Sequence, residues 1–493
     1  MRRLVSVAVV AAAATLVVSG CTTLLAGKPV SMFADPFRVA GLPATDGPSG
    51  LRPDAAAPTR HVDDGNGGQE DTLAAQAVSD IEQFWNGAYR PALDGNFQPA
   101  TALVSWDSTQ YSTRQFCDSD TYKLDNAMYC WDNNDIGWDR GQLLPTLRKQ
   151  FGDISIPLVL GHEYGHAIQR RAQLAGPATP SLVAEQQADC FAGVYMRWVA
   201  EGRSPRFTVS TGDGLNNVLA TMISLRDPVE SAVDSDPDVD QHGSAFERIS
   251  AFQLGFTDGP SACAGIDKKE VEQRRGDFPV SLTQNSTGEW LVSEESVKAI
   301  IDAMTKAFSP ADPPKLSFDA SAAQSCKDAR PSPPASYCPA TNTIAVDLPA
   351  LEKLGTPSEE RGSFGLPVGD TTAYSALVSR YMLALEKQRG VVLDNAEASL
   401  RTACLTGVAT TKMSQQINVD GHTVQLAAGD LDEAVSGMLT NGLAASDVDG
   451  ESVPSGFSRI DAFRTGVLGD EDRCFKRYPG CWGDDRHPAV TRA

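Results

Sequence analysis

The sequence predicts an α+β fold in two tandem domains, each mostly helical with a small sheet. At about 150 residues per domain, a chain of 493 residues has room for roughly two to four such units. A set of motifs that occurs twice in the same order reduces this number to two. Helical periodicity dominates both copies, and a strand-like segment follows the first helical pattern of each.

The composition is that of a globular protein with an acidic surface. Hydrophobic residues make up 41% and charged residues 21%, which argues against wholesale disorder or a fibrous repeat. The formal net charge is −21. Such a surface repels phosphate backbones, so no nucleic-acid partner is expected.

The N-terminus has the features of a targeting segment. Arg2 and Arg3 precede a run of apolar and small residues that ends at Val18, and the Ser-Gly-Cys that follows resembles a bacterial lipobox. We therefore expect residues 1–20 to be a lipoprotein signal peptide and Cys21 to be lipidated. The lipid would hold the protein on the extracytoplasmic face of the cell membrane without spanning it. An ordinary signal peptide with a chance cysteine is the alternative.

The segment after Cys21 is expected to be a flexible tether. Residues 21–72 are rich in Gly, Pro, Ala and Asp and show no hydrophobic periodicity. The folded domains are then expected over residues 73–268 and 285–493.

Each domain is expected to begin with a helix and to continue with a strand. Amphipathic helical patterns cover Ala75 to Trp85 and Val297 to Phe308. Strand-like segments follow at residues 129–139 and 337–347. The remaining periodicity is mostly helical, so each domain should hold a small sheet against a helical body.

The repeat rests on four groups of residues at similar intervals. They pair Tyr129-Cys130 and Ile136 with Tyr337-Cys338 and Ile344, Cys190 and Gly193 with Cys404 and Gly407, Gly212-Asp213 with Gly429-Asp430, and Arg248-Ile249 with Arg459-Ile460. In an oxidising compartment, the cysteines of such a repeat should form equivalent disulfides. The expected pairs are Cys117–Cys130 with Cys326–Cys338, and Cys190–Cys263 with Cys404–Cys474. Cys481 is left over, and a Cys474–Cys481 pair is the competing possibility.

A metal-binding motif, HExxH, lies in an apolar run of helical length. His162 and His166 are four residues apart and share one helix face, so both imidazoles can bind one ion. Glu163 lies about 100° further round and can reach water beside the metal, which suits a general base.

A catalytic zinc site needs a third protein ligand. The long metzincin motif is absent, because Gln169 and Ala172 stand where it needs Gly and His. Glu185 and Asp189 follow on a second helical stretch, four residues apart and so on one face. We assign Glu185 as the third ligand and Asp189 as the acceptor that orients a ligand histidine.

These segments resemble a known family. The sequences HEYGHAIQ at 162–169, EQQADCFAG at 185–193 and HGSAFER at 242–248 are together similar to the putative neutral zinc metallopeptidases of bacteria. The last two also resemble the gluzincin membrane peptidases. The resemblance covers about residues 73–268. It implies a zincin-like fold, one Zn²⁺ in the N-terminal domain and hydrolysis of a peptide or protein substrate.

The second copy lacks this set of residues. The positions of His162, Glu163, His166, Glu185, Asp189 and His242 hold Ser379, Arg380, Leu383, Ser399, Ala403 and Val453. The loss marks Asp189 and His242 as functional, and His242 is a candidate donor to the developing oxyanion. Arg248 keeps a counterpart in Arg459, which favours a structural ion pair, although a role beside the metal stays open.

The leading hypothesis is a lipid-anchored zinc peptidase whose second domain is non-catalytic and positions substrate or a protein partner. One alternative is a scaffold or binding lipoprotein with a structural or vestigial metal site. Glu163 favours the enzyme, since a structural zinc needs no base. A zinc amidase acting on cell-wall peptides would share the same site, and the sequence does not separate it from the first reading.

Overall fold

The computed structural model describes most of the chain. The described residues are 22–25, 28–31, 34–227, 242–275, 278, 290–357 and 364–480. The expected signal peptide, the expected lipidation site Cys21, and Cys481, which the expected disulfide pairing leaves over, lie outside them. Among the described residues, no helix combines the length and hydropathy needed to cross a bilayer.

Helices predominate and the sheets are small, which confirms the α+β class. The N-terminal half contains β1 (Thr22–Leu25), β2 (Lys28–Ser31), β3 (Arg38–Val39), β4 (Leu42–Pro43), β5 (Gly50–Leu51), α1 (Gln69–Ala88), β6 (Leu103–Trp106), β7 (Gln115–Phe116), β8 (Ser119–Asp120), β9 (Ala127–Cys130), β10 (Asp135–Asp139), α2 (Leu143–Phe151), α3 (Ser155–Ala172), α4 (Ser181–Ala200), β11 (Phe207–Thr208), α5 (Asp213–Ser224), α7 (Ala245–Asp258), α8 (Pro260–Ala264) and α9 (Lys268–Arg275). The C-terminal half contains α10 (Glu294–Phe308), β12 (Lys315–Ser317), α11 (Ser321–Gln324), β13 (Ala335–Cys338), β14 (Thr343–Val346), α12 (Leu348–Leu354), α13 (Asp370–Gln388), α14 (Ala396–Met413), β15 (Ile417–Val419), β16 (His422–Val424), α15 (Ala428–Thr440), α16 (Gly456–Val467) and α17 (Glu471–Arg477).

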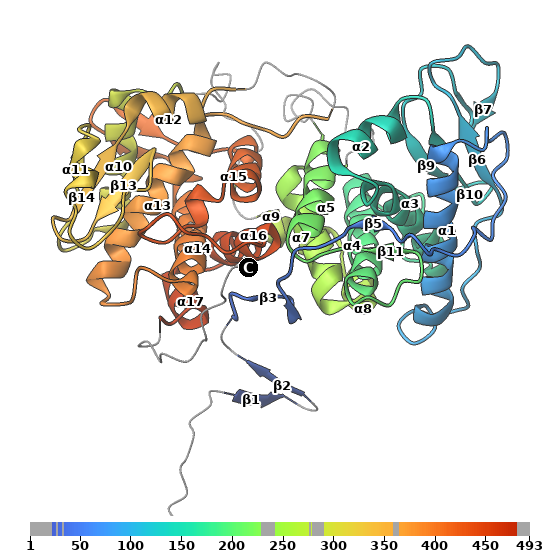
Figure 1. Cartoon of the computed structure of the whole chain (residues 1–493), viewed down its shortest axis with the longest axis horizontal. Coiled ribbons are helices and arrows are strands. Elements are labelled where there is room, and N and C mark those ends of the chain that lie inside the picture. Colours follow the sequence, from blue (N-terminus) through green and yellow to red (C-terminus); the bar gives the residue numbers. More distant parts are fainter. Residues whose placement is uncertain are drawn as a thin grey trace, which may run out of the picture.

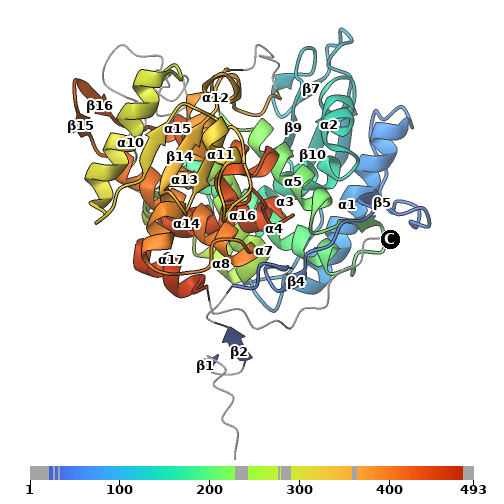
Figure 2. The same ribbon diagram turned by 60° about the vertical axis from the view of Figure 1, so that its left-hand side comes forward.

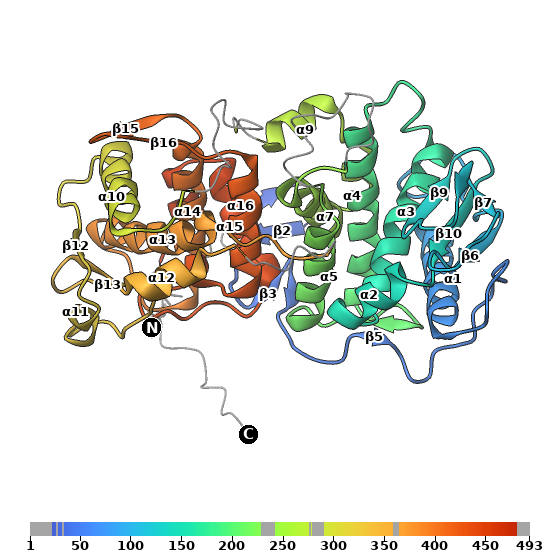
Figure 3. The same cartoon turned by 90° about the horizontal axis from the view of Figure 1, so that it is seen from above.

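Each half has one three-stranded sheet with the same topology. In the first, β10 lies between β6 and β9, parallel to β6 and antiparallel to β9. In the second, β14 has the same relation to β12 and β13. Figures 1 and 3 show the two sheets at opposite ends of the molecule, with the long helices between them. The expected strand segments are therefore each a hairpin with a third, parallel strand beside it.

The long helices of the two halves pack through the same close contacts. A Cβ on Gly193 of α4 would lie 2.1 Å from the Phe252 carbonyl oxygen of α7, and only glycine allows that approach. Gly407 of α14 makes the equivalent contact, 2.1 Å from the Phe463 oxygen of α16. The duplicated glycines of the sequence therefore mark one helix pair in each half.

The four expected disulfides are present in the structure. Cys190 joins Cys263, and Cys404 joins Cys474, across loops of 73 and 70 residues. The shorter bridges are Cys117–Cys130 and Cys326–Cys338. Cys404 is therefore bonded to Cys474, as the repeat predicts.

The expectation of a free tether up to residue 72 is wrong for residues 34–72. Val39 is fully buried, and β5 pairs with β11 and runs beside α1 (Figure 2). The first helix begins at Gln69, and Asp71 in its first turn accepts hydrogen bonds from Ser105 and Trp138. Residues 34–72 show no hydrophobic periodicity, yet they are packed against the domain. The residues that they contact lie far away in the sequence, so no local pattern reveals the packing.

The two halves meet through α5 and α7 on one side and α15 and α16 on the other (Figures 1 and 3). Asn216 of α5 accepts a hydrogen bond from the Gly456 backbone of α16 at 2.8 Å. Gln253 of α7 donates to the Phe457 carbonyl at 2.9 Å. Buried apolar residues run through both halves as one continuous core. This contact holds α7, which carries Arg248, against the C-terminal half.

Candidate metal centre

The HExxH segment lies in the middle of α3, and its residues are buried except for His166, which is partly exposed. His162 and Glu163 are each 8% exposed. A Cβ on Gly165 would lie 2.7 Å from the Ala188 Cα of α4, so the glycine lets the two helices pack closely. This approach brings Glu185, one turn before Ala188, to the histidines of α3.

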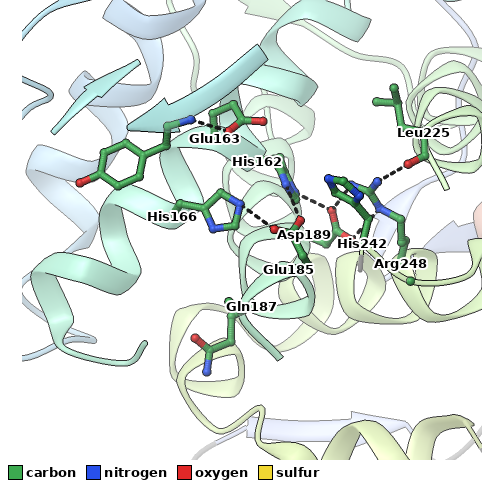
Figure 4. Close-up of polar contacts among 12 residues, drawn as sticks. His162, Glu163, His166, Glu185, Gln187, Asp189, Leu225, His242 and Arg248 are labelled. Atoms are coloured by element: carbon green, nitrogen blue, oxygen red, sulfur yellow. Dashed lines mark hydrogen bonds and ion pairs between the residues drawn. The ribbon is translucent and has the colours of Figure 1, made fainter. Parts of the chain in front are cut away.

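The three expected ligands converge. The Nε2 atom of His162 lies 3.1 Å from Oε2 of Glu185, and the Nε2 atom of His166 lies 3.3 Å from Oε1 of the same carboxylate. One donor atom from each residue fits within 4.8 Å of the other two. Figure 4 shows the two imidazoles pointing toward Glu185 from α3. The arrangement can hold one metal ion on two nitrogens and a carboxylate.

A buried ion pair orients His162. Its Nδ1 atom donates to Oδ1 of Asp189 at 2.7 Å, and Arg248 of α7 donates to both oxygens of that carboxylate, at 2.8 and 3.0 Å. Asp189 is fully buried. A further nitrogen of Arg248 donates to the Leu225 carbonyl at the end of α5. Asp189 therefore has the position expected from the sequence. Its hydrogen bond to Nδ1 turns the Nε2 atom of His162 toward the ligand site.

Sequence reasoning missed the partner of the other histidine. The Nδ1 atom of His166 donates to Oε1 of Gln169 at 3.0 Å. Gln169 in turn donates to the Ala184 carbonyl and to Oε1 of Gln187, at 3.2 Å for the latter. Gln169 is three residues after His166 and so on the same helix face, which is the signal that could have revealed it.

The proposed general base is held by the edge of the sheet. The backbone N–H of Tyr129 in β9 donates to Oε2 of Glu163 at 2.8 Å. Burial raises the pKa of Glu163, although the two neighbouring histidines act against the shift. A carboxyl group with a raised pKa is suited to exchange a proton near neutral pH.

The protonation of the site fits a cation in its centre. Burial acts against charge on His162, but Asp189 and Glu185 outweigh it and raise the pKa of this imidazole to about 10. Burial likewise opposes charge on Glu185, yet the two histidines hold its pKa well below the ordinary value. Oε2 of Glu185 is buried and forms an ion pair with Nε2 of His162 at 3.1 Å. A zinc ion would replace the imidazole protons whose positive charge now balances the Glu185 carboxylate.

His242 lies on the other side of His162 from His166 (Figure 4). It lines the same cavity of about 140 Å³ as His162 and Glu163, and 44% of its side chain is exposed. Its Nδ1 atom lies 3.1 Å from Oδ1 of Asp227, a partner that sequence reasoning missed. The oxyanion role of His242 stays a prediction.

The C-terminal half has different chemistry at the equivalent positions. Arg380 stands in place of Glu163, is 2% exposed and donates to Ser446 and to the Asp447 carbonyl. Burial lowers the pKa of Arg380 to about 10. Arg459, the counterpart of Arg248, donates to the backbone carbonyls of Met438, Leu439 and Val453. Three carboxylates, Asp370, Asp430 and Glu433, do gather in this half, without a histidine.

Comparison with known proteins agrees with the motifs. The family model described as putative neutral zinc metallopeptidase matches residues 30–266, which include the three ligand candidates, Glu163, His242 and Arg248. No curated protein and no solved structure matches the chain. The matched span begins within the segment expected to be a tether (residues 21–72), which agrees with the packing of residues 34–72. Residues 30–266, just under half of the chain, are therefore similar to the family of putative neutral zinc metallopeptidases.

Proposed function

We propose that this protein is a zinc-dependent metallopeptidase in which Glu163 is the general base. The observation that carries the proposal is the convergence of His162, His166 and Glu185, whose ligand atoms lie within 4.8 Å of one another. Glu163 is adjacent to the first ligand on the same helix. The family of residues 30–266 supports the same class of reaction.

When bound, Zn²⁺ would supply a Lewis acid that lowers the pKa of water and polarises the substrate carbonyl. Glu163 takes a proton from the attacking water and returns it to the leaving amine. The Tyr129 amide fixes the orientation of the Glu163 carboxylate through the 2.8 Å hydrogen bond.

His242 is proposed to donate a hydrogen bond to the oxygen on which negative charge develops. Asp227 binds its Nδ1 atom, so Nε2 is the atom assigned to this contact. One donor of this kind is worth about 2.7–4 kcal/mol.

We propose that the remaining parts of the chain hold this site at the membrane and bring substrate or a protein partner to it. The lipobox-like sequence supports a signal peptide over residues 1–20 and a lipid on Cys21, which would anchor the enzyme outside the cytoplasmic membrane. The equal topology of the two sheets and the equal glycine contacts support a duplication, with residues 285–493 as a non-catalytic zincin-like copy of residues 73–268. That copy is proposed to position substrate or a protein partner.

The test compares Glu163→Gln with Glu201→Gln, a change at the end of α4 where the glutamate pairs with Arg197. Casein, a peptide library and cell-wall peptides are incubated with each zinc-loaded protein, and zinc content is measured by elemental analysis. We expect Glu163→Gln to keep one zinc and to lose hydrolysis by about 10²–10⁴-fold. Glu201→Gln should keep both the bound zinc and the hydrolytic activity.

Three other outcomes have defined meanings. Unchanged hydrolysis in Glu163→Gln contradicts its assignment as the base. Wild-type protein that binds zinc and cleaves none of the substrates supports the scaffold alternative. Cleavage of the cell-wall peptides alone identifies the enzyme as an amidase.

A further inference from the structure

We propose that the groove between α10 and β12 is a docking site for an extended, basic segment of a partner protein, which adds to β12 as a parallel strand. The α10–β12 groove measures about 550 Å³ and lies between one face of α10, from Glu294 to Thr305, and the stretch from Pro313 to Phe318. It is at the end of the molecule away from α3 (Figure 3). This role deepens the one proposed for the C-terminal half, and it rests on the proposed duplication of the two halves rather than on hydrolysis.

In the N-terminal half, the equivalent place between α1 and β6 is filled by residues 59–66 of the same chain. Asp63 pairs with β6 in parallel. Its N–H donates to the Leu103 carbonyl at 2.7 Å, and its carbonyl accepts from the Ser105 N–H at 3.0 Å. Val62 is half-buried and packs against the core. Residues 59–66 therefore cover the edge of β6 as an added strand does.

Three side chains of α1 hold residues 59–66 from the other side. The contacts are Thr59 N–H to Oγ of Ser79 at 2.9 Å, Asn66 N–H to Oδ2 of Asp71 at 2.8 Å, and the ion pair of Arg60 with Glu82. Two of them bind backbone, so they do not depend on the sequence of the bound segment. The ion pair selects a basic side chain at one position.

The same positions of α10 line the open groove. The Tyr164 hydroxyl donates to Glu82 of α1, and the Tyr381 hydroxyl, at the equivalent position of α13, donates to Thr305 of α10. Aligning Glu82 with Thr305 places the other two holding residues of α1, Asp71 and Ser79, at Glu294 and Asp302. All three positions of α10 lie in the lining of the groove. The helix side of the docking site is therefore present in the C-terminal half.

The strand side is present as well, and no described residue covers it. Leu316 pairs with Ile344 as Leu103 pairs with Ile136, so the Leu316 carbonyl and the Phe318 N–H correspond to the two groups of β6 that Asp63 binds. Within the described part of the chain, β12 pairs with β14 alone, and no backbone group bonds to its other side. An unpaired edge is a template for an added strand.

The charges in the groove favour a basic segment. Lys298 pairs with Glu294 at 2.5 Å, and its Nζ atom lies 5.5 Å from the centre of the Phe318 ring. Asp302 is exposed and forms no ion pair with the described residues. It stands where Ser79 has no charge, so the negative charge lies one turn from the position of Glu82. A Lys or Arg of the bound segment would pair with Asp302, which gives the groove its selectivity.

The probes are two fluorescent peptides that copy residues 58–66, with serine at the positions of Asp63 and Asp64. The basic probe keeps Arg at the position of Arg60, and the acidic probe has Glu there. Both are titrated into the full-length Glu163→Gln protein with zinc added, so that hydrolysis does not consume them, and dissociation constants are measured by fluorescence anisotropy. We expect the basic probe to bind at least about threefold more tightly than the acidic one. A photo-crosslinker at the position of Val62 should label residues 294–318.

Two matched pairs of variants, each made in the Glu163→Gln protein, test the groove itself. Asp302→Lys should reverse the preference between the probes. Glu295→Lys reverses the same charge on α10 at an exposed residue outside the lining, and should leave the preference unchanged. Phe318→Ala should weaken both probes by at least about fivefold. Phe308→Ala removes the same atoms at the end of α10, also outside the lining, and should not.

The outcomes separate the groove from the peptidase. Absence of saturable binding, equal affinity for the two probes, equal effects within a pair of variants, or crosslinks only in the N-terminal half each overturn the groove. None of these results bears on the peptidase, because hydrolysis is not measured. Loss of the peptidase assignment leaves the groove standing when binding follows the variant pairs and the crosslinks lie in residues 294–318.

Discussion

The Asp432 carboxylate of α15 accepts a hydrogen bond from the backbone N–H of Phe246, 186 residues away in the sequence and 3.0 Å away in space. Phe246 lies in the first turn of α7, two residues before Arg248. The other oxygen of Asp432 lies 3.9 Å from Nε of Arg226. Because Arg248 holds Asp189, the C-terminal half supports the helix that orients a candidate metal ligand.

Asp432→Ala should destabilise the protein and loosen this support. The change leaves a buried N–H at the start of α7 without its acceptor, which costs about 1–3 kcal/mol. Chemical unfolding measures the loss, and Asp302→Ala, at an exposed position of α10, is the control. Equal stability of the two variants would show that Asp432 does not hold α7.

Asp432 should also make stability depend on pH. Burial raises its pKa to about 7 against the ordinary value of 3.8, with Arg226 acting against the shift and Glu247 adding to it. Between these two values the unfolded chain has lost the proton that the folded protein retains. The free energy of unfolding therefore falls as pH rises, by about 1.4 kcal/mol per unit from this group alone.

The comparison is with Asp432→Asn, in which no proton is gained or lost at this position. Unfolding curves at pH 5, 6 and 7 should show a more negative slope for the wild type than for the variant. Parallel slopes would mean that Asp432 is ionised throughout this range.

Asp189→Asn should weaken metal binding while leaving all three ligands in place. The amide is a poorer acceptor for the Nδ1–H of His162 and leaves Arg248 without its counter-charge. Loss of such a partner typically costs 10–100-fold in metal affinity. Competition with a zinc chelator measures it, with Asp213→Asn at an exposed site on α5 as the control. Wild-type affinity in Asp189→Asn would assign Asp189 to the fold alone.

Zinc binding should release protons. The pKa of about 10 keeps His162 protonated at neutral pH in the metal-free protein, and a metal needs its Nε2 lone pair. Apparent affinity should therefore rise about tenfold per pH unit from pH 6 to 8 for each proton released. Calorimetry in buffers of different ionisation enthalpy counts the protons, and an enthalpy independent of the buffer would contradict the expectation.

Much of the site could be predicted from the sequence because its main residues lie on two helices. His162 with His166, and Glu185 with Asp189, are each four residues apart, so the helical period alone places each pair on one face. The disulfides followed from the repeat, since each cysteine pair has a counterpart at similar spacing. Local periodicity and internal duplication are properties that one sequence contains.

The remaining contacts join segments that lie far apart in the sequence and that no helical or strand periodicity relates. Asp227 beside His242, the Tyr129 amide on Glu163 and Asp432 on α7 became apparent only when the chain was folded. The packing of residues 34–72 belongs with them. The sequence by itself determined which side chains could bind a metal, because ligand type and helical spacing are local. The tertiary structure decided what orients those ligands and what lines the pocket beside them, because backbone amides, caps and walls come from distant elements whose pairing depends on global packing.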